Sequence, residues 1–250
     1  MQNFTTLKKK RIELTEHIAE TSPLIYARIA GALYLLMIPL GIMGILYVPS
    51  TLIVPGDAAT TASNIMASES LFRLSIVCAL IIPINQIFLV LVLHKLLKPV
   101  SKIHALLMVI FVLVGAPIAM LNEFNQFAAL LLLSGADYLT VFGADQLLAQ
   151  MMLFLDLHGS GILIAGLFWG LWLFPMGYLV FKSGFLPRII GILLMIGCFG
   201  YLIDSITIIL IPSFNSIAQY ASIGEVLLPL WLVIKGVDVE QWEKRVLESA

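Results

Sequence analysis

The stretch from Asp145 to Phe181 constrains the fold most strongly, because it is apolar and contains no Lys, Arg or Glu. As a single helix it would be about 54 Å long, whereas the hydrocarbon core of a bilayer is about 30 Å thick. Such a helix must either project beyond the bilayer or break. Because glycine and serine pairs are common sites of helix kinks, we expect a break at Gly159-Ser160-Gly161.

Glycines recur along this stretch at spacings of seven, four and seven residues, which places them on one helical face: Gly159, Gly166, Gly170 and Gly177. A face of small residues lets a second helix backbone come close, which is how helices associate in lipid. Asp156 precedes Gly159 by three residues, so we expect it to share this face and to point into the bundle. His158 is expected to point elsewhere. The stretch is therefore predicted to be the central packing element.

The overall composition indicates a polytopic membrane protein. Of the 250 residues 60% are hydrophobic and only 12% are charged, whereas soluble domains carry about 25% charged residues. The mean hydropathy is +1.03. The basic residues form short clusters beside apolar runs, so the lipid bilayer is the expected partner and nucleic acid is not. No motif for a cofactor is present, and none is predicted.

Six apolar runs predict an all-α bundle of six transmembrane helices, at about 27–48, 71–94, 103–133, 145–181, 189–211 and 217–234. The chain then divides into a polar tail over 1–24, a membrane domain over 25–235 and a second polar tail over 236–250. Between the first two runs, Asp57 is a suitable N-cap for a short helix through Ala58–Ser68.

The basic residues predict the orientation. With six spans, Arg73 alone lies on one side of the membrane, and the other thirteen of the fourteen Lys and Arg lie on the opposite side. The positive-inside rule makes that opposite side cytoplasmic, so both termini are expected in the cytoplasm of a bacterium and the protein in its inner membrane. The thirteen are Lys8, Lys9, Lys10, Arg11, Arg28, Lys95, Lys98, Lys102, Lys182, Arg188, Lys235, Lys244 and Arg245.

Ionisable residues inside the apolar runs are the candidates for a binding site, because burying them in lipid is costly. Counted from the basic end of its run, Asp204 lies at a depth of about 24 Å and Glu225 at about 15 Å. They are the deepest pair and the favoured functional core. The further candidates are Arg73, Glu123, Asp156 and His158 near the outer boundary, and Asn85, which follows a proline.

Two interpretations of these residues stay open. In the first, they form a polar chamber, open to the outside, that binds a small polar solute or a cation. In the second, they form a lid of paired charges in which Arg73 neutralises one carboxylate. A metal site would need three or four converging ligands, and one histidine with several carboxylates leaves that question undecided.

Several short motifs together resemble one known family. They are LIVPGDAATTASNI at 52–65, SESLFR at 68–73, LLLSGADYL at 131–139, FGADQL at 142–147, FLDLHG at 154–159, SGFLPR at 183–188 and GYLIDS at 200–205. The chain resembles the bacterial membrane proteins of domain-of-unknown-function family 4386 over about residues 25–242. The resemblance implies a multi-helix membrane protein and supplies no catalytic residues. It also implies a second histidine late in the fourth run, where this chain has Trp169 and Trp172.

Three functions are therefore compared. The favoured one is a small-solute or ion binding or transport protein with a polar chamber in its outer half. The second is a non-catalytic membrane component that acts through a partner. The third is a membrane-embedded enzyme that uses Asp156 and His158 with a carboxylate. The sequence does not fix an oligomeric state.

Overall fold

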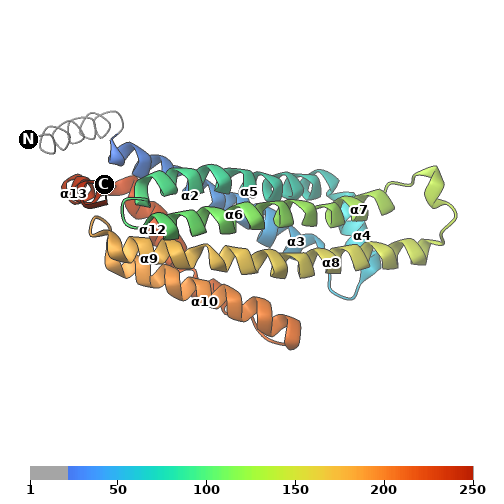
Figure 1. The fold of residues 1–250 in the computed structure, drawn as a ribbon. Coiled ribbons are helices and arrows are strands. Elements are labelled where there is room, and N and C mark those ends of the chain that lie inside the picture. The colour runs from blue at the N-terminus through green and yellow to red at the C-terminus, as the bar shows by residue number, and fades with distance from the viewer. Residues whose placement is uncertain (1–21, 250) are drawn as a thin grey trace, which may run out of the picture.

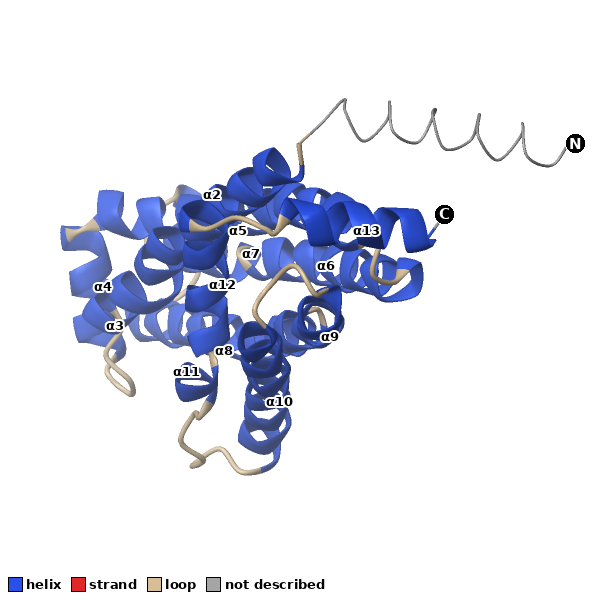
Figure 2. Ribbon diagram, turned by 90° about the vertical axis from the view of Figure 1, so that its left-hand side faces the viewer, coloured by secondary structure: helices blue, strands red, loops and turns tan. Residues whose placement is uncertain are grey.

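The computed structural model describes residues 22–249, and within this range every regular element is a helix (Figures 1 and 2). The basic run at 8–11 and most of the tail predicted for 1–24 lie outside the described residues. In chain order the elements are α2 (Pro23–Gly41), the π-helix η1 (Ile42–Tyr47), α3 (Val48–Leu52), α4 (Ala58–Ala67), α5 (Glu69–Leu97), α6 (Lys102–Asn122), α7 (Phe124–Leu132), the short 3-10 helix η2 (Asp137–Leu139), α8 (Ala144–Leu171), α9 (Leu173–Ser183), α10 (Arg188–Leu210), α11 (Ala218–Ala221), α12 (Ile223–Ile234) and α13 (Val239–Ser249).

Within the described range, five helical stretches are long and apolar enough to cross a membrane. They are Pro23–Leu52, Glu69–Leu97, Lys102–Leu132, Ala144–Ser183 and Arg188–Leu210. Many large apolar side chains on their outer faces are exposed, among them Phe88, Leu113 and Ile196. A soluble bundle would bury such residues, so the chain is a multi-pass membrane protein.

The sixth predicted run is shorter than expected. Helix α12 has 12 residues, which corresponds to about 18 Å, well below the thickness of the hydrocarbon core. The residues before it form the short helix α11 and a non-helical segment from Ile211 to Ile217. Pro212 cannot continue α10, because its ring clashes with the preceding turn and it has no N–H to donate.

The fourth run does not break where the sequence predicted. Helix α8 continues through Gly159-Ser160-Gly161, and the interruption falls at Trp172, between α8 and α9. Pro175 explains this position, because it has no N–H to donate to the carbonyl of Leu171 one turn earlier. The whole stretch Ala144–Ser183 has 40 residues, or about 60 Å, so it both breaks and extends beyond a bilayer core.

The glycine face of α8 and α9 packs against α10 over most of its length. A Cβ atom at Gly170 would lie 2.9 Å from Cβ of Tyr201, and one at Gly177 would lie 2.6 Å from the backbone oxygen of Gly191. A Cβ at Gly166 would lie 3.1 Å from Oγ of Ser205. At Gly170 and Gly177 the approach is so close that a larger residue would push the helices apart, whereas at Gly166 only the Ser205 side chain would have to move.

Gly159 and Asp156 correct the prediction for the end of this face. A Cβ at Gly159 would meet nothing within 4 Å, and both residues are exposed. The reason is the length of the partner helix: α10 runs antiparallel to α8 and ends at Leu210, soon after it passes Gly166. The face therefore continues past its partner, and Asp156 points away from the bundle.

The C-terminal segment forms helix α13, which packs back onto the bundle. Nε1 of Trp242 donates a hydrogen bond to the backbone oxygen of Leu96 at 2.8 Å, and Nη2 of Arg245 donates to that of Lys182 at 2.8 Å. These carbonyls lie in the last turns of α5 and α9, whose final C=O groups have no partner within their own helix. In Figure 1, α13 lies at the same end of the molecule as the α5–α6 and α9–α10 turns.

Asp57 caps α4, as the sequence predicted. Its Oδ1 accepts a hydrogen bond from the backbone N–H of Thr60 at 2.9 Å, and the helix runs from Ala58 to Ala67. These hydrogen bonds stabilise the charged carboxylate and lower the pKa of Asp57 below its ordinary value.

Candidate functional site

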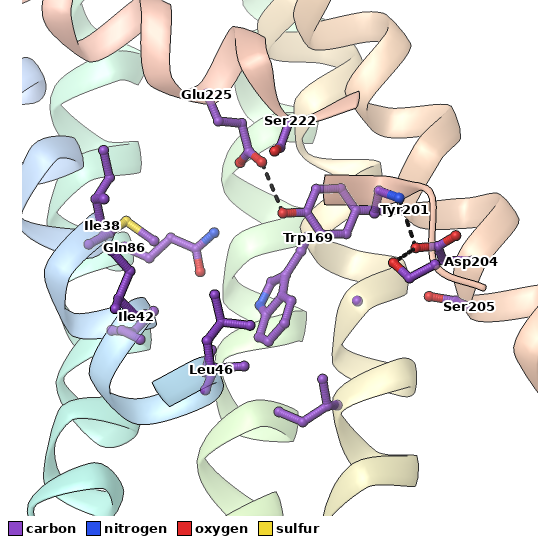
Figure 3. Close-up of a pocket in the computed structure, with 18 of the residues that line it drawn as sticks. Ile38, Ile42, Leu46, Gln86, Trp169, Tyr201, Asp204, Ser205, Ser222 and Glu225 are labelled. Carbon is purple, nitrogen blue, oxygen red and sulfur yellow. Dashed lines mark hydrogen bonds between the residues drawn. The ribbon is translucent and has the colours of Figure 1, made fainter. Parts of the chain in front are cut away.

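A cavity of about 570 Å³ lies between α2, η1, α5, α8, α10 and α12 (Figure 3). Its apolar side is formed mainly by α2 and η1 on one wall and by α8 on another. The side chains on these walls are Met37, Ile38, Ile42, Ile45, Leu46, Ile162 and Leu163. The polar residues on the side of α10 and α12 are Tyr34, Tyr201, Asp204, Ser205, Ser216, Ser222 and Glu225, while Gln86 lies across the cavity beside Ile38. The cavity therefore has an apolar body, one polar wall and a single amide on the other side.

Glu225 stands on the first turn of α12 and faces this cavity. Its Oε1 accepts a hydrogen bond from the Tyr34 hydroxyl at 3.0 Å, and its Oε2 accepts one from the Tyr201 hydroxyl at 3.0 Å. Both donors are neutral phenols. Within residues 22–249 no Lys or Arg forms an ion pair with this carboxylate. The side chain is only half-buried, because part of its surface faces the cavity.

Aromatic rings surround the space beside Glu225. The ring centroids of Tyr34 and Trp172 are 5.7 Å apart, with the ring planes tilted by 49°. Trp169 and Tyr201 also line the cavity, and Figure 3 shows both on the same side as Glu225. Aromatic rings therefore lie beside the Glu225 carboxylate, and of these Trp169 and Tyr201 are the ones that are partly exposed.

Asp204 lines the same cavity but has a different role. Its Oδ1 accepts a hydrogen bond from the backbone N–H of Ile217 at 2.8 Å, and its Oδ2 accepts one from that of Ala218 at 2.9 Å. Oδ2 also accepts a hydrogen bond from the Ser216 hydroxyl. The carboxylate therefore fixes the segment that leads into α11, and this segment forms part of the cavity wall.

Asn85 does not line the cavity, and the next residue does. The Asn85 amide donates a hydrogen bond to the backbone oxygen of Leu33 at 2.7 Å, which joins α5 to α2. Gln86 is turned by about 100° from Asn85 around the helix and faces the cavity. The prediction for Asn85 therefore identified the right helical turn and the wrong residue.

Arg73 does not take part in a polar chamber or in a charged lid. It pairs with Glu69, one turn away on the same helix, with Nε at 2.7 Å from Oε1. The two side chains are 57% and 52% exposed. An exposed pair of this kind contributes little to stability, and it leaves both cavity carboxylates without a basic partner.

Glu123 and His158 form a separate polar cluster that lies outside the cavity lining. His158 Nε2 lies 3.0 Å from Glu123 Oε1, and the Gln126 amide donates to Glu123 Oε2 at 2.9 Å. The Asn122 amide donates to the backbone oxygen of His158 at 2.9 Å. The Asn122 side chain occupies the space that a Cβ at Gly161 would need. Gln126 Oε1 is buried and has no hydrogen-bond partner in the described region.

His158 therefore corrects a prediction. It is buried between helices and faces Glu123, whereas Asp156 is the residue that points away. The difference arises because α7 and α6 also pack against α8, and His158 lies on a different face of that helix from the glycines that α10 covers. Within the described residues no group of three or more His, Cys, Asp and Glu side chains is placed to hold a metal ion.

The cavity also contains residues that sequence reasoning missed. Tyr34 and Tyr201 supply both hydroxyls to Glu225, yet an isolated tyrosine in an apolar run gives little signal. One signal was present at Tyr201, which precedes Asp204 by three residues and so lies on the same helical face. Trp169 and Trp172 were noted only as a departure from a family pattern.

Comparison with known proteins identifies relatives without a described function. The family model described as Domain of unknown function (DUF4386) matches residues 29–236, a range that includes every residue that lines the cavity. An uncharacterized protein of Archaeoglobus fulgidus is 33% identical over 166 residues, which cover 65% of this chain and 83% of the relative. No solved structure matches the chain.

Proposed function

The chain belongs to the DUF4386 family, as its motifs predicted, and because the family description assigns no activity we propose a function from the cavity itself. The protein binds a small amphiphilic solute inside the membrane. The observation that carries this proposal is an apolar cavity of about 570 Å³ with two carboxylates, Asp204 and Glu225, on one wall. Small-molecule sites are about 300–1,000 Å³, mostly apolar, with a few placed polar groups.

The rim of the cavity supports access from the bilayer. Ile42 and Leu46 line the cavity and are 48% and 62% exposed, so one edge of the opening is apolar. Both belong to η1, the π-helical turn that follows α2. Single π-helical turns often occur at functional sites, because they re-aim side chains locally. An apolar rim formed by Ile42 and Leu46 favours a solute that enters from the lipid phase.

The non-helical segment from Ile211 to Ile217 supports the same proposal. Most of its residues are exposed, and the part that joins the cavity wall is its C-terminal end. Here Ser216 and Ala218 contribute to the cavity wall, and Asp204 satisfies the N–H groups of Ile217 and Ala218. The backbone is therefore non-helical just before it joins one wall of the proposed binding site.

The proposed topology has six crossings, with both termini in the cytoplasm and the protein in the inner membrane of a bacterium. Its sixth crossing consists of the segment from Ile211 together with α11 and α12. The thirteen-to-one distribution of basic residues supports this orientation. On this topology Glu225 lies about 15 Å from the cytoplasmic end of α12.

The enzyme hypothesis has no support in the geometry that it required. It needed Asp156 and His158 to act with a carboxylate, and these two side chains point to different faces of α8. The hypothesis of a component that acts through a partner required a bundle without a cavity, which the structure does not favour.

The proposal is tested by filling the cavity. Gly41 lines the cavity, and a Cβ at this position would meet nothing within 4 Å, so Gly41→Phe should fit without collision. Gly159→Phe is a matched control, because Gly159 also has open space around it but lies outside the cavity. Binding is measured in nanodiscs of the uncharged lipid digalactosyl diacylglycerol as quenching of tryptophan fluorescence by bromodecanol, since Trp169 and Trp172 line the cavity.

Saturable quenching in the wild type and in Gly159→Phe, with loss of the saturable part in Gly41→Phe, is the expected result. Quenching that rises linearly with probe in all three proteins would show partition into lipid alone, and it would contradict the proposed function.

A further inference from the structure

The charged groups on the cavity wall are all acidic. Among the described residues that line it, Asp204 and Glu225 carry carboxylates, and no Lys, Arg or His is present. We propose that the cavity selects amphiphiles with an organic ammonium head group, and that Glu225 is the counter-ion of that group. This inference rests on the proposed function and adds the chemical class of the solute.

Glu225 is the carboxylate that is available to a ligand. Its fixed partners, the hydroxyls of Tyr34 and Tyr201, orient both oxygens but bring no positive charge. The N-terminus of α12 supplies at most about half a unit of positive charge, spread over its first turn. A compensating charge stabilises a carboxylate at membrane depth, and the cavity provides space for one beside Glu225.

Asp204 is not available in the same way. Its oxygens already accept hydrogen bonds from two backbone N–H groups and from Ser216. It still contributes negative potential to the cavity wall. An anionic head group would therefore face two carboxylates and no cation, and it should be excluded.

The rings beside Glu225 favour a soft, poorly hydrated cation. The faces of Trp and Tyr rings attract ammonium groups, and aromatic cages with an acidic residue recognise quaternary ammonium ligands. Trp169 and Tyr201 line the cavity and are partly exposed, whereas the rings of Tyr34 and Trp172 are buried against each other behind them. A bare metal cation would need several oxygen ligands instead, and the described residues offer no such cluster.

The opposite wall suits a single alkyl tail. Ile38, Ile42 and Leu46 follow one face of α2 and η1, and Figure 3 shows Ile38 and Ile42 across the cavity from Tyr201 and Asp204, with Leu46 beside Trp169. The tail would extend along these residues toward the apolar rim, while the head group stays at the polar wall. The solute class is thus a lipophilic amine or quaternary ammonium compound.

Three probes with one tail and different head groups test this inference: bromodecyl-trimethylammonium, bromodecanol and bromodecyl sulfonate. Each is titrated against the full chain in nanodiscs of digalactosyl diacylglycerol, an uncharged lipid without an ammonium group that could compete for the cavity, with Gly41→Phe nanodiscs as the blank for lipid partition. We expect the cation to bind about tenfold more tightly than the alcohol, since only the cation gains the charge pair with Glu225 and the cation–π contact. The sulfonate should show no saturable quenching.

Glu225→Gln keeps the shape of the side chain and removes its charge, so it should bring the cation and the alcohol to within about twofold of each other. Glu69→Gln is the matched control, because it removes a carboxylate that is exposed and far from the cavity lining. It should keep the full preference. The ranking of the three probes in the wild type needs no variant, so it tests the inference even where Glu225→Gln fails to fold.

Equal saturable binding of the cation and the alcohol in the wild type would overturn the inference and leave the proposed function standing. An unchanged preference in folded Glu225→Gln would also overturn it, because the selectivity would then lie elsewhere. Absence of saturable binding for all three probes would instead contradict the proposed function, and the inference with it.

Discussion

Glu123 and Glu225 are both carboxylates inside apolar helical regions, but their surroundings differ. Glu123 is 3% exposed, and its two oxygens contact His158 and Gln126. Glu225 is half-buried, contacts two neutral phenols and faces a cavity. One carboxylate has a potential cation and no free space, whereas the other has free space and no cation. The first arrangement stabilises a fold, and the second leaves a charge for a ligand to compensate.

The largest effect is expected from His158→Ala. Removing the imidazole leaves the Glu123 carboxylate buried without its partner, which should lower the free energy of unfolding by about 3 kcal/mol. Asp156→Ala, two residues away on the exposed face, should change it by less than about 0.5 kcal/mol. Denaturant unfolding in detergent micelles measures both. Equal free energies of unfolding for the two variants would show that the Glu123–His158 pair does not stabilise the fold more than an exposed residue of α8.

The next effect compares a glycine in a helix interface with one beside the cavity. Gly170→Leu must push α10 away, because a Cβ there already lies 2.9 Å from Tyr201, and overpacking of this kind costs about 1–3 kcal/mol. Gly41→Leu enters open space and should cost less than about 0.5 kcal/mol. Thermal unfolding in detergent separates the two. If Gly41→Leu is the more damaging variant, the space beside α2 is not a cavity.

A smaller effect is expected from Asp204→Ala. The variant removes a charged acceptor from the N–H groups of Ile217 and Ala218, and the loss of such caps costs about 0.5–2 kcal/mol. Hydrogen exchange should become faster in residues 211–222 and stay unchanged in α6 and α7. Uniformly faster exchange would show that Asp204 supports the whole bundle and not one cavity wall.

The smallest effect concerns Asp57, an exposed carboxylate that serves as a hydrated reference for Glu123 and Glu225. Hydrogen bonds from Thr60 lower its pKa in the folded state, so its capping contribution is present above the unfolded pKa, about 3.9. That contribution is lost as the pH falls through the lower folded pKa. The protection factor of the Thr60 amide, its intrinsic exchange rate divided by the observed rate, should therefore fall at acidic pH in the wild type. Asp57→Ala should show low protection at every pH, and a matching pH step in this variant would argue against the cap.

Five long helical stretches and their approximate limits followed from the sequence, because a backbone in lipid must satisfy its hydrogen bonds within the protein, as a helix does. The cap at Asp57 followed from local hydrogen bonding, which needs no knowledge of the fold. The packing of Gly166, Gly170 and Gly177 could be predicted because the spacing of these residues places them on one helical face. Such predictions use information that lies within a single helix.

The remaining features depended on neighbouring helices. The outward position of Asp156 follows from where α10 ends, and the inward position of His158 follows from where α7 packs. The roles of Tyr34 and Tyr201 follow from the placement of α12 between them. Counting residues along the sequence placed both Asp204 and Glu225 inside the membrane. Only the structure shows that Asp204 holds a loop and that Glu225 faces open space.

The most direct test locates the bromine atom of bound bromodecyl-trimethylammonium by anomalous scattering from crystals of the full chain. The account predicts one strong bromine peak inside the cavity, beside η1 and α8, with the ammonium group next to Glu225 and the rings of Trp169 and Tyr201. The peak should disappear in crystals of Gly41→Phe. Bromine peaks confined to the outer, lipid-facing surface, with the space beside Glu225 filled by protein side chains, would contradict the account.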